Sequence, residues 1–165
     1  MKIGKGVEWA AHTCALLGLL PPGAALSTDA LAAFLGVPAP YLAKQLQALS
    51  RAGIVVAKRG VAGGYRLARP PEDLSLWDVT AAIEGTTPSF RCTEVRRSGP
   101  CGASPEECSR PCPIAAAFRR AETAFRESLE SVRLTAVIDA VAQEATSARK
   151  RRIRSWIAQE AALPA

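Results

Sequence analysis

Four of the five cysteines in this 165-residue chain lie in one short segment, a thiol density typical of metal binding. They are Cys92, Cys101, Cys108 and Cys112, separated by eight, six and three residues. The segment is polar, contains Gly and Pro, and shows no helical or strand pattern, so few apolar side chains can order it. Thiolates are soft ligands that select zinc, copper or an iron–sulfur cluster. We therefore expect a thiolate-bound metal or cluster here.

A second pair of potential ligands lies near the N-terminus. Glu8 and His12 are four residues apart, so their side chains share one face of a helix, and His12 is the only histidine of the chain. An isolated pair of this kind is more often an ordinary surface pair, and the cysteine segment is what makes it a candidate ligand pair. The fifth cysteine, Cys14, falls among apolar residues and is most simply a small buried hydrophobe.

Size and composition indicate one domain, or a small domain with a helical arm. Hydrophobic residues make up 48% of the chain, which is ample for a core. No signal peptide is recognised, and the apolar residues 13–20 are too few to span a bilayer, so we expect a soluble cytoplasmic protein without a membrane partner. In that compartment clustered cysteines are more often metal ligands or redox sensors than disulfides.

The positive charge is concentrated in the N-terminal part of the chain. Residues 1–70 hold eight Lys and Arg against two Asp and Glu, whereas the remaining residues are balanced. An excess confined to one segment is typical of a module that binds a polyanion.

The same segment has the pattern of a helix-turn-helix. A mostly apolar helix is expected over residues 7–20, a short helix over 28–35 after the N-cap Ser27, and a third helix over about 39–52. The third helix has an apolar face, and Lys44, Gln45, Ser50 and Arg51 are expected to point largely the other way. The helix-turn-helix therefore spans about residues 26–52.

A β-hairpin is expected directly after these helices. Residues 54–56 read as a strand, residues 58–64 as a basic, Gly-rich tip, and residues 65–67 as a return strand. Helices followed by such a hairpin form a winged helix, with the wing at about 54–68. The alternative is a small helical core with a hairpin that binds no DNA.

The rest of the chain reads as helices around the cysteine segment. A capping box at Ser75 begins a helix that closes at Gly85, and a long helix is expected over about 114–132. Its apolar stripe favours dimerisation, with packing back on its own protomer as the alternative. The predicted fold is mostly α with a small β-hairpin wing: a winged helix-turn-helix domain (1–85), a cysteine-rich loop (86–112), a dimerisation helix and following helix (113–145), and a solvated basic C-terminal tail (146–165).

In order along the chain, these features resemble a family of bacterial transcription factors, the iron–sulfur cluster regulators and nitric-oxide-sensitive repressors. The resemblance covers about residues 1–135. It rests on residues 41–46 of the third helix, Gly60 and Gly63-Gly64-Tyr65-Arg66-Leu67 of the wing, Leu76-Trp77-Asp78-Val79, Ile83-Glu84-Gly85 and Cys112-Pro113-Ile114. It implies a homodimeric, DNA-binding regulator, most often a repressor, that senses redox state or nitric oxide through a cluster.

The resemblance also implies a ligand set. Members of the family often draw a non-thiolate ligand from the first helix. Glu8, His12, Cys108 and Cys112 resemble the ligand arrangement of the redox-sensing branch, which implies that they hold a 2Fe–2S cluster, here across the dimer interface. Cys92 is the nearest further candidate ligand and Cys101 a weaker one, while Trp9 is expected beside the cluster. The alternatives are an all-cysteine centre, with 4Fe–4S possible, and a structural zinc site or reversible thiol switch.

The DNA contacts follow from the winged-helix geometry. The third helix is expected in the major groove of a pseudo-palindromic operator, with Pro40, Tyr41, Lys44 and Gln45 near its leading end. Lys58 and Arg59 of the wing are expected at the minor groove, and Ser27 and Thr28 at phosphates. An enzyme is not expected, because the chain has no C-x-x-C pair, no Gly-rich phosphate loop and no second histidine.

Overall fold

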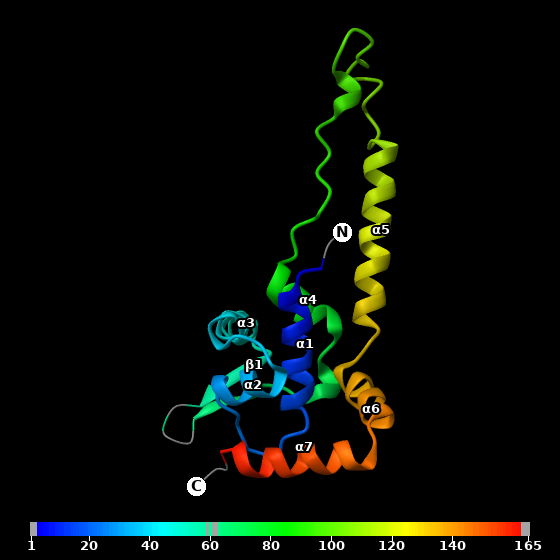
Figure 1. Ribbon diagram of the computed structural model, residues 1–165. Helices are drawn as coiled ribbons and strands as arrows, with labels where there is room; N and C mark the ends of the chain where they lie inside the picture. Colours follow the sequence, from blue (N-terminus) through cyan, green and yellow to red (C-terminus); the bar gives the residue numbers. More distant parts are fainter. Residues whose placement is uncertain (1–2, 59, 61–62, 163–165) are drawn as a thin grey trace.

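The computed structural model describes residues 3–58, 60 and 63–162, which form a helical body and one projecting arm (Figure 1). Among these residues no helix has both the length and the apolar character needed to cross a bilayer. The helices and strands are α1 (Lys5–Leu17), α2 (Thr28–Leu35), α3 (Ala39–Arg51), β1 (Val55–Lys58), β2 (Gly64–Leu67), α4 (Leu76–Glu84), α5 (Pro113–Glu130), α6 (Leu134–Glu144) and α7 (Ser147–Glu160), with short 3-10 helices at Pro71–Asp73 and Val95–Arg97.

The helix-turn-helix forms where the sequence predicts it. The Ser27 hydroxyl oxygen accepts a hydrogen bond from the Ala30 N–H at 3.0 Å and caps α2. Gly36 ends α2 in the left-handed conformation, with φ of 65°, which glycine adopts without strain. Pro38 precedes α3, whose Leu42, Leu46 and Leu49 are fully buried. These local signals fix α2 and α3 in place.

The wing is a two-stranded antiparallel hairpin. Val55 pairs with Leu67 and Lys58 with Gly64, and an isolated bridge joins Leu26, just before α2, to Tyr65 of β2. The hairpin is thereby attached to the base of the helix-turn-helix. The prediction of a mostly helical fold with a small hairpin is confirmed.

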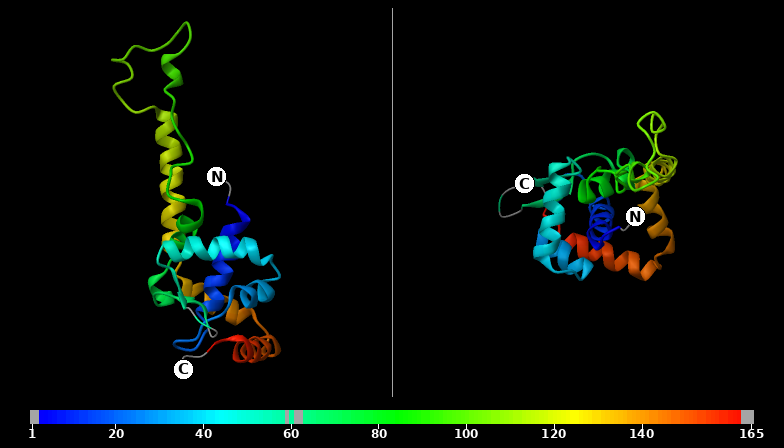
Figure 2. Two further views of the ribbon diagram at one scale, coloured as in Figure 1. Left: turned by 90° about the vertical axis from the view of Figure 1, so that its left-hand side faces the viewer. Right: turned by 90° about the horizontal axis from the view of Figure 1, so that it is seen from above.

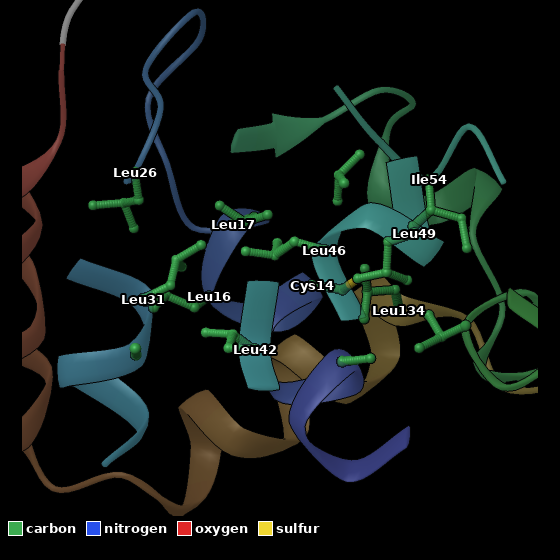
Figure 3. Close-up of a cluster of buried hydrophobic side chains, with 14 of the residues drawn as sticks. Cys14, Leu16, Leu17, Leu26, Leu31, Leu42, Leu46, Leu49, Ile54 and Leu134 are labelled. Carbon is green, nitrogen blue, oxygen red and sulfur yellow. The ribbon is translucent and has the colours of Figure 1, made fainter. Parts of the chain in front are cut away.

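The core surrounds α1, which runs through the middle of the body (Figures 1 and 2). Leucines from α1, α2 and α3 meet Ile54 and Leu134 of α6 there, and Cys14 lies among them with 0% of its surface exposed (Figure 3). The expectation of a small buried hydrophobe at Cys14 is confirmed. Gly18 caps α1, so the helix ends three residues earlier than expected from the sequence.

The arm consists of α5 and the segment that leads to it from α4 (Figure 1). The two are fastened together: the rings of Phe90 and Phe118 stack with centroids 4.4 Å apart, and the Glu122 carboxylate accepts hydrogen bonds from the backbone N–H groups of Ser89 and Phe90. Near the body, the rings of Trp77 of α4 and Phe125 of α5 meet edge to face, with centroids 6.5 Å apart. Among the residues that the structure describes, the arm packs on its own protomer mainly through its base and this segment.

The C-terminal residues form a packed helix rather than a solvated tail. Trp156 of α7 lies against Phe34 of α2, and Ile157 is buried. Ala162 forms a bridge with Ala25 through two backbone hydrogen bonds of 2.9 and 3.0 Å. The expected C-terminal helix is present and its basic side is exposed, but the expectation that the helix is wholly solvated is wrong, because its apolar side closes the outer face of α2.

Candidate functional site

The surface of α3 opposite its buried leucines is the candidate DNA-reading face. Pro40, Tyr41 and Lys44 are exposed on this helix, Tyr41 by 63%. Gln47 and Arg51 are exposed as well and follow Lys44 by three and seven residues, so they continue the same face. A helical projection opposite Leu42, Leu46 and Leu49 would have identified Gln47 as well.

Gln45 differs from its neighbours. It is half-buried, because its carboxamide lies against Gly6 of α1 rather than in solvent. A Cβ atom added to Gly6 would lie 3.1 Å from Cδ, Oε1 and Nε2 of Gln45. The expectation that Gln45 points largely away from the protein is therefore corrected, and its role in adenine recognition stays a prediction.

The other predicted DNA contacts surround this face. Ser27 is exposed, and its oxygen is engaged in capping α2 while its hydroxyl hydrogen is left to donate. Thr28 is half-buried in the first turn of α2, and Lys58 is half-buried at the end of β1. Arg59 lies outside the residues that the structure describes. In Figure 2, α3, α2 and the hairpin face the viewer together.

One arginine fastens the two halves of the cysteine loop. The Arg96 guanidinium forms an ion pair with Glu94, at 2.8 Å, and donates to the backbone carbonyl oxygens of Arg110, at 2.6 Å, and Cys108, at 3.4 Å. These contacts bring residues 94–96 beside residues 108–110. A positive charge is thereby placed next to the thiols of the loop.

Cys92 and Cys112 are adjacent in this arrangement. Cys112 is the N-cap residue of α5, and the backbone N–H groups of Ala115 and Ile114 lower its thiol pKa below the usual value, as do Arg96 and a hydrogen bond from Cys92. The Glu94 backbone favours the Cys92 thiolate, yet desolvation and the Glu94 carboxylate, 3.4 Å from Sγ, outweigh it and raise the pKa of Cys92. The pKa values of the two thiols are therefore shifted in opposite directions, downward for Cys112 and upward for Cys92.

The remaining predicted ligands are not gathered with this pair within one chain. Cys101 is exposed and Cys108 half-buried in the loop. Glu8 and His12 are exposed and Trp9 half-buried on α1, in the body, whereas the loop stands at the far end of α5 (Figures 1 and 2). Within the described part of the chain, no three His, Cys, Asp or Glu side chains are close enough to hold a metal ion. The donor chemistry suits an iron–sulfur cluster, but in the described part of one chain the donors are not gathered around a common point at either place.

Residues 3–140 match the model of the Rrf2 family, described as iron-dependent transcriptional regulator. An HTH-type transcriptional regulator of Lactococcus lactis is 30% identical over 139 residues, which cover 84% of this chain and 88% of that protein. A protein of the same description from Synechocystis is 46% identical over 74 residues, or 45% of this chain and 50% of that protein. The chain thus spans about half the length of this last relative.

Solved structures share the fold. The IscR protein of T. potens aligns with a TM-score of 0.66 and 22% identity, covering 90% of this chain and 95% of that one. The global cysteine regulator CymR of B. subtilis aligns with a TM-score of 0.63 and 21% identity, covering 85% and 98%. The arrangement of winged helix and arm is therefore a fold that these two solved structures share.

Proposed function

Because the chain belongs to the Rrf2 family of DNA-binding transcriptional regulators, which are not enzymes, we propose a specific role within it. The protein acts in the cytoplasm as a homodimeric repressor that senses redox state or nitric oxide through a 2Fe–2S cluster. Glu8 and His12 of one protomer and two cysteines of its partner's loop hold the cluster, beside Trp9.

The division of donors between two distant places carries this proposal. One chain presents thiols at the end of its arm and an exposed carboxylate–imidazole pair on its body, and among the described residues neither set is gathered into a metal site. A two-fold arrangement of two chains completes both sets at once, because the arm of each protomer meets the body of the other. Cys112 is one thiolate ligand, and Cys108 is the second, with Cys92 as its competitor.

The arm itself supplies the surface for this dimer. Ile114 and Phe118 of α5 are exposed by 63% and 49%, although they are large and apolar, and Ala115 is the residue of α5 that is buried. A long helix with an uncovered apolar stripe gains free energy by packing on another helix. A second copy of this chain covers it.

The cluster, when bound, would gain or lose one electron and so change the charge at its site by one unit. An imidazole ligand in place of a thiolate raises the reduction potential of such a cluster. The chain's own residues transmit that change, since α1 carries ligands and packs directly on α3. Two copies of α3 in successive major grooves read a pseudo-palindromic operator, and the hairpins reach the flanking minor grooves.

A second candidate is a reversible thiol switch, which the contact between Cys92 and Cys112 favours. Two thiols join as a disulfide when they pass two electrons and two protons to a peroxide, whose O–O bond breaks to give two waters, or one water and one alcohol from an organic hydroperoxide. A structural zinc ion held by the same loop is the redox-inert form of this alternative.

Protein purified without oxygen separates these functions. A brown protein with visible charge-transfer bands, iron and sulfide supports the cluster, and His12→Ala then alters the spectrum while Lys5→Ala, exposed on the same helix, leaves it unchanged. Colourless protein with zinc, or a disulfide formed on peroxide addition, supports the second candidate. Iron-free protein that binds its operator unaltered contradicts the cluster.

A further inference from the structure

The first turn of α1 touches the DNA-reading helix at a glycine. The Gln45 carboxamide of α3 lies flat on Gly6, since a Cβ atom there would be equally close, at 3.1 Å, to its carbon, oxygen and nitrogen. A side chain at position 6 would occupy the space that Gln45 fills. Because Gly6 has no side chain, α1 and α3 can approach each other at this point.

Gln45 has its hydrogen-bonding groups free in this position. No hydrogen bond to its carboxamide is found among the residues that the structure describes, so packing rather than polar contact holds it on Gly6. Its Cα stands next to Lys44 on α3, at the edge of the exposed face. Rotation about its side-chain torsions would carry the same amide toward a base edge, where glutamine pairs with adenine.

The turn that carries Gly6 is fixed from the opposite side by α4. The Gly4 N–H donates to Oε1 of Glu84 at 3.0 Å, and Gly4 caps α1 without a side chain of its own. Glu84 is the last residue of α4, so its carboxylate stands at the positive end of the α1 dipole. The first turn of α1 is thus held between α4 and the recognition helix.

Glu8 projects from this same turn into solvent, and His12 follows one turn later. A group bound to these two side chains is attached through Glu8 at two residues from Gly6 and through His12 at six. A shift of the turn changes the surface on which Gln45 rests, because the space between them is too small for even an added Cβ atom to fit without a displacement of Gln45.

We propose that the first turn of α1 controls Gln45: in one position Gly6 holds the carboxamide on α1, and in the other it releases the carboxamide to read a base. Gln45 is then the signal-dependent contact of α3, while Lys44, Gln47 and Arg51 are constant contacts. This inference rests on the proposed function in one respect, namely that the signal arrives through Glu8 and His12.

Gly6→Ala tests the contact, and alanine favours helix over glycine, so the variant folds. Operator affinity is measured twice for each protein, once with the cluster present and once after its removal, and the ratio of the two affinities is compared. The proteins are the wild type, Gly6→Ala, Gln45→Ala and the double variant. We expect a wild-type ratio on the order of tenfold, the worth of a glutamine–adenine pair, and a ratio near one in all three variants. Gln47→Ala is the matched control and weakens binding equally in both states.

Two outcomes are distinct. A wild-type ratio of one overturns the sensing function and the relay together, whereas an unchanged tenfold ratio in Gly6→Ala overturns the relay alone. A readout without any cluster is the nuclear magnetic resonance signal of the Gln45 side-chain NH2 in metal-free protein, which shifts in Gly6→Ala. An unshifted signal also overturns the inference.

Discussion

The indole of Trp156 lies against the ring of Phe34, with centroids 4.7 Å apart and ring planes at 50°. This pair joins the last helix of the chain to the first helix of the helix-turn-helix. Because α7 begins after residue 140, where the match to the Rrf2 model ends, the contact attaches an element from outside the family match to the DNA-binding module.

Trp156→Ala is expected to destabilise the fold by about 1–3 kcal/mol, because a half-buried aromatic contact and its apolar area are lost. Urea unfolding followed by circular dichroism measures the change. Arg151→Ala, an exposed position of the same helix, is expected to stay within about 0.5 kcal/mol of the wild type. Equal effects of the two substitutions would contradict the packing of α7.

The buried thiol of Cys14 gives stability a dependence on alkaline pH. Burial raises the pKa of this thiol to about 12 from the ordinary 9.0. The contribution of the neutral thiol to the free energy of unfolding is therefore complete below pH 9 and is lost as pH rises toward 12. We expect a loss of about 1.4 kcal/mol per pH unit in this window from this group. Cys14→Ala removes that part of the slope in urea unfolding at pH 8, 9 and 10, and the exposed Cys101→Ala keeps it.

The Glu122 carboxylate holds the segment that leads into the cysteine loop. Glu122→Ala removes the acceptor of the Ser89 and Phe90 N–H groups, so these two amides are expected to exchange with solvent about fivefold to tenfold faster. Hydrogen exchange followed by mass spectrometry measures the rate. Exchange unchanged relative to Glu127→Ala, an exposed position on the same helix, would show that the segment is held by Phe90 alone.

Lys44 and Arg51 are expected to contact the DNA backbone or bases from the exposed face of α3. Each substitution by alanine weakens operator binding, and a lost phosphate contact reduces the slope of log affinity against log salt by about 0.9. Fluorescence anisotropy between 50 and 200 mM salt, chosen as roughly the range over which such slopes are measured, gives both quantities. Arg151→Ala on α7 serves as the control, and an equal change of slope there would contradict the assignment of the reading face.

Local sequence patterns were sufficient for the winged helix and for the family resemblance, which the Rrf2 match confirms. The leucine spacing of α3, the Ser27 cap and the Ser75 capping box are each determined by residues within a turn of one another. Such signals do not depend on distant contacts. The same holds for the hairpin, whose Gly-Gly-Tyr return strand is a short-range pattern.

The contacts that the sequence did not reveal join residues far apart in the chain. The Gln45 carboxamide lies against Gly6 of another helix. The Arg96 guanidinium donates hydrogen bonds to carbonyl oxygens 12 and 14 residues away, in a segment whose sequence has no periodic pattern. The apolar spacing of Ile153, Trp156 and Ile157 indicates a packed side for α7, yet where that side packs depends on the half-buried Phe34 of α2, far away in the sequence. Tertiary contacts of this kind override helix propensity and charge pattern.

The bridge between Ala25 and Ala162 has a consequence for biosynthesis. Translation delivers residues of the winged module well before residue 162, so this module obtains its contact with Ala162 only after α7 has left the ribosome. A nascent polypeptide in which α7 has not yet been made leaves the outer side of α2 uncovered, so we expect the winged module to be less firmly assembled until α7 folds onto it.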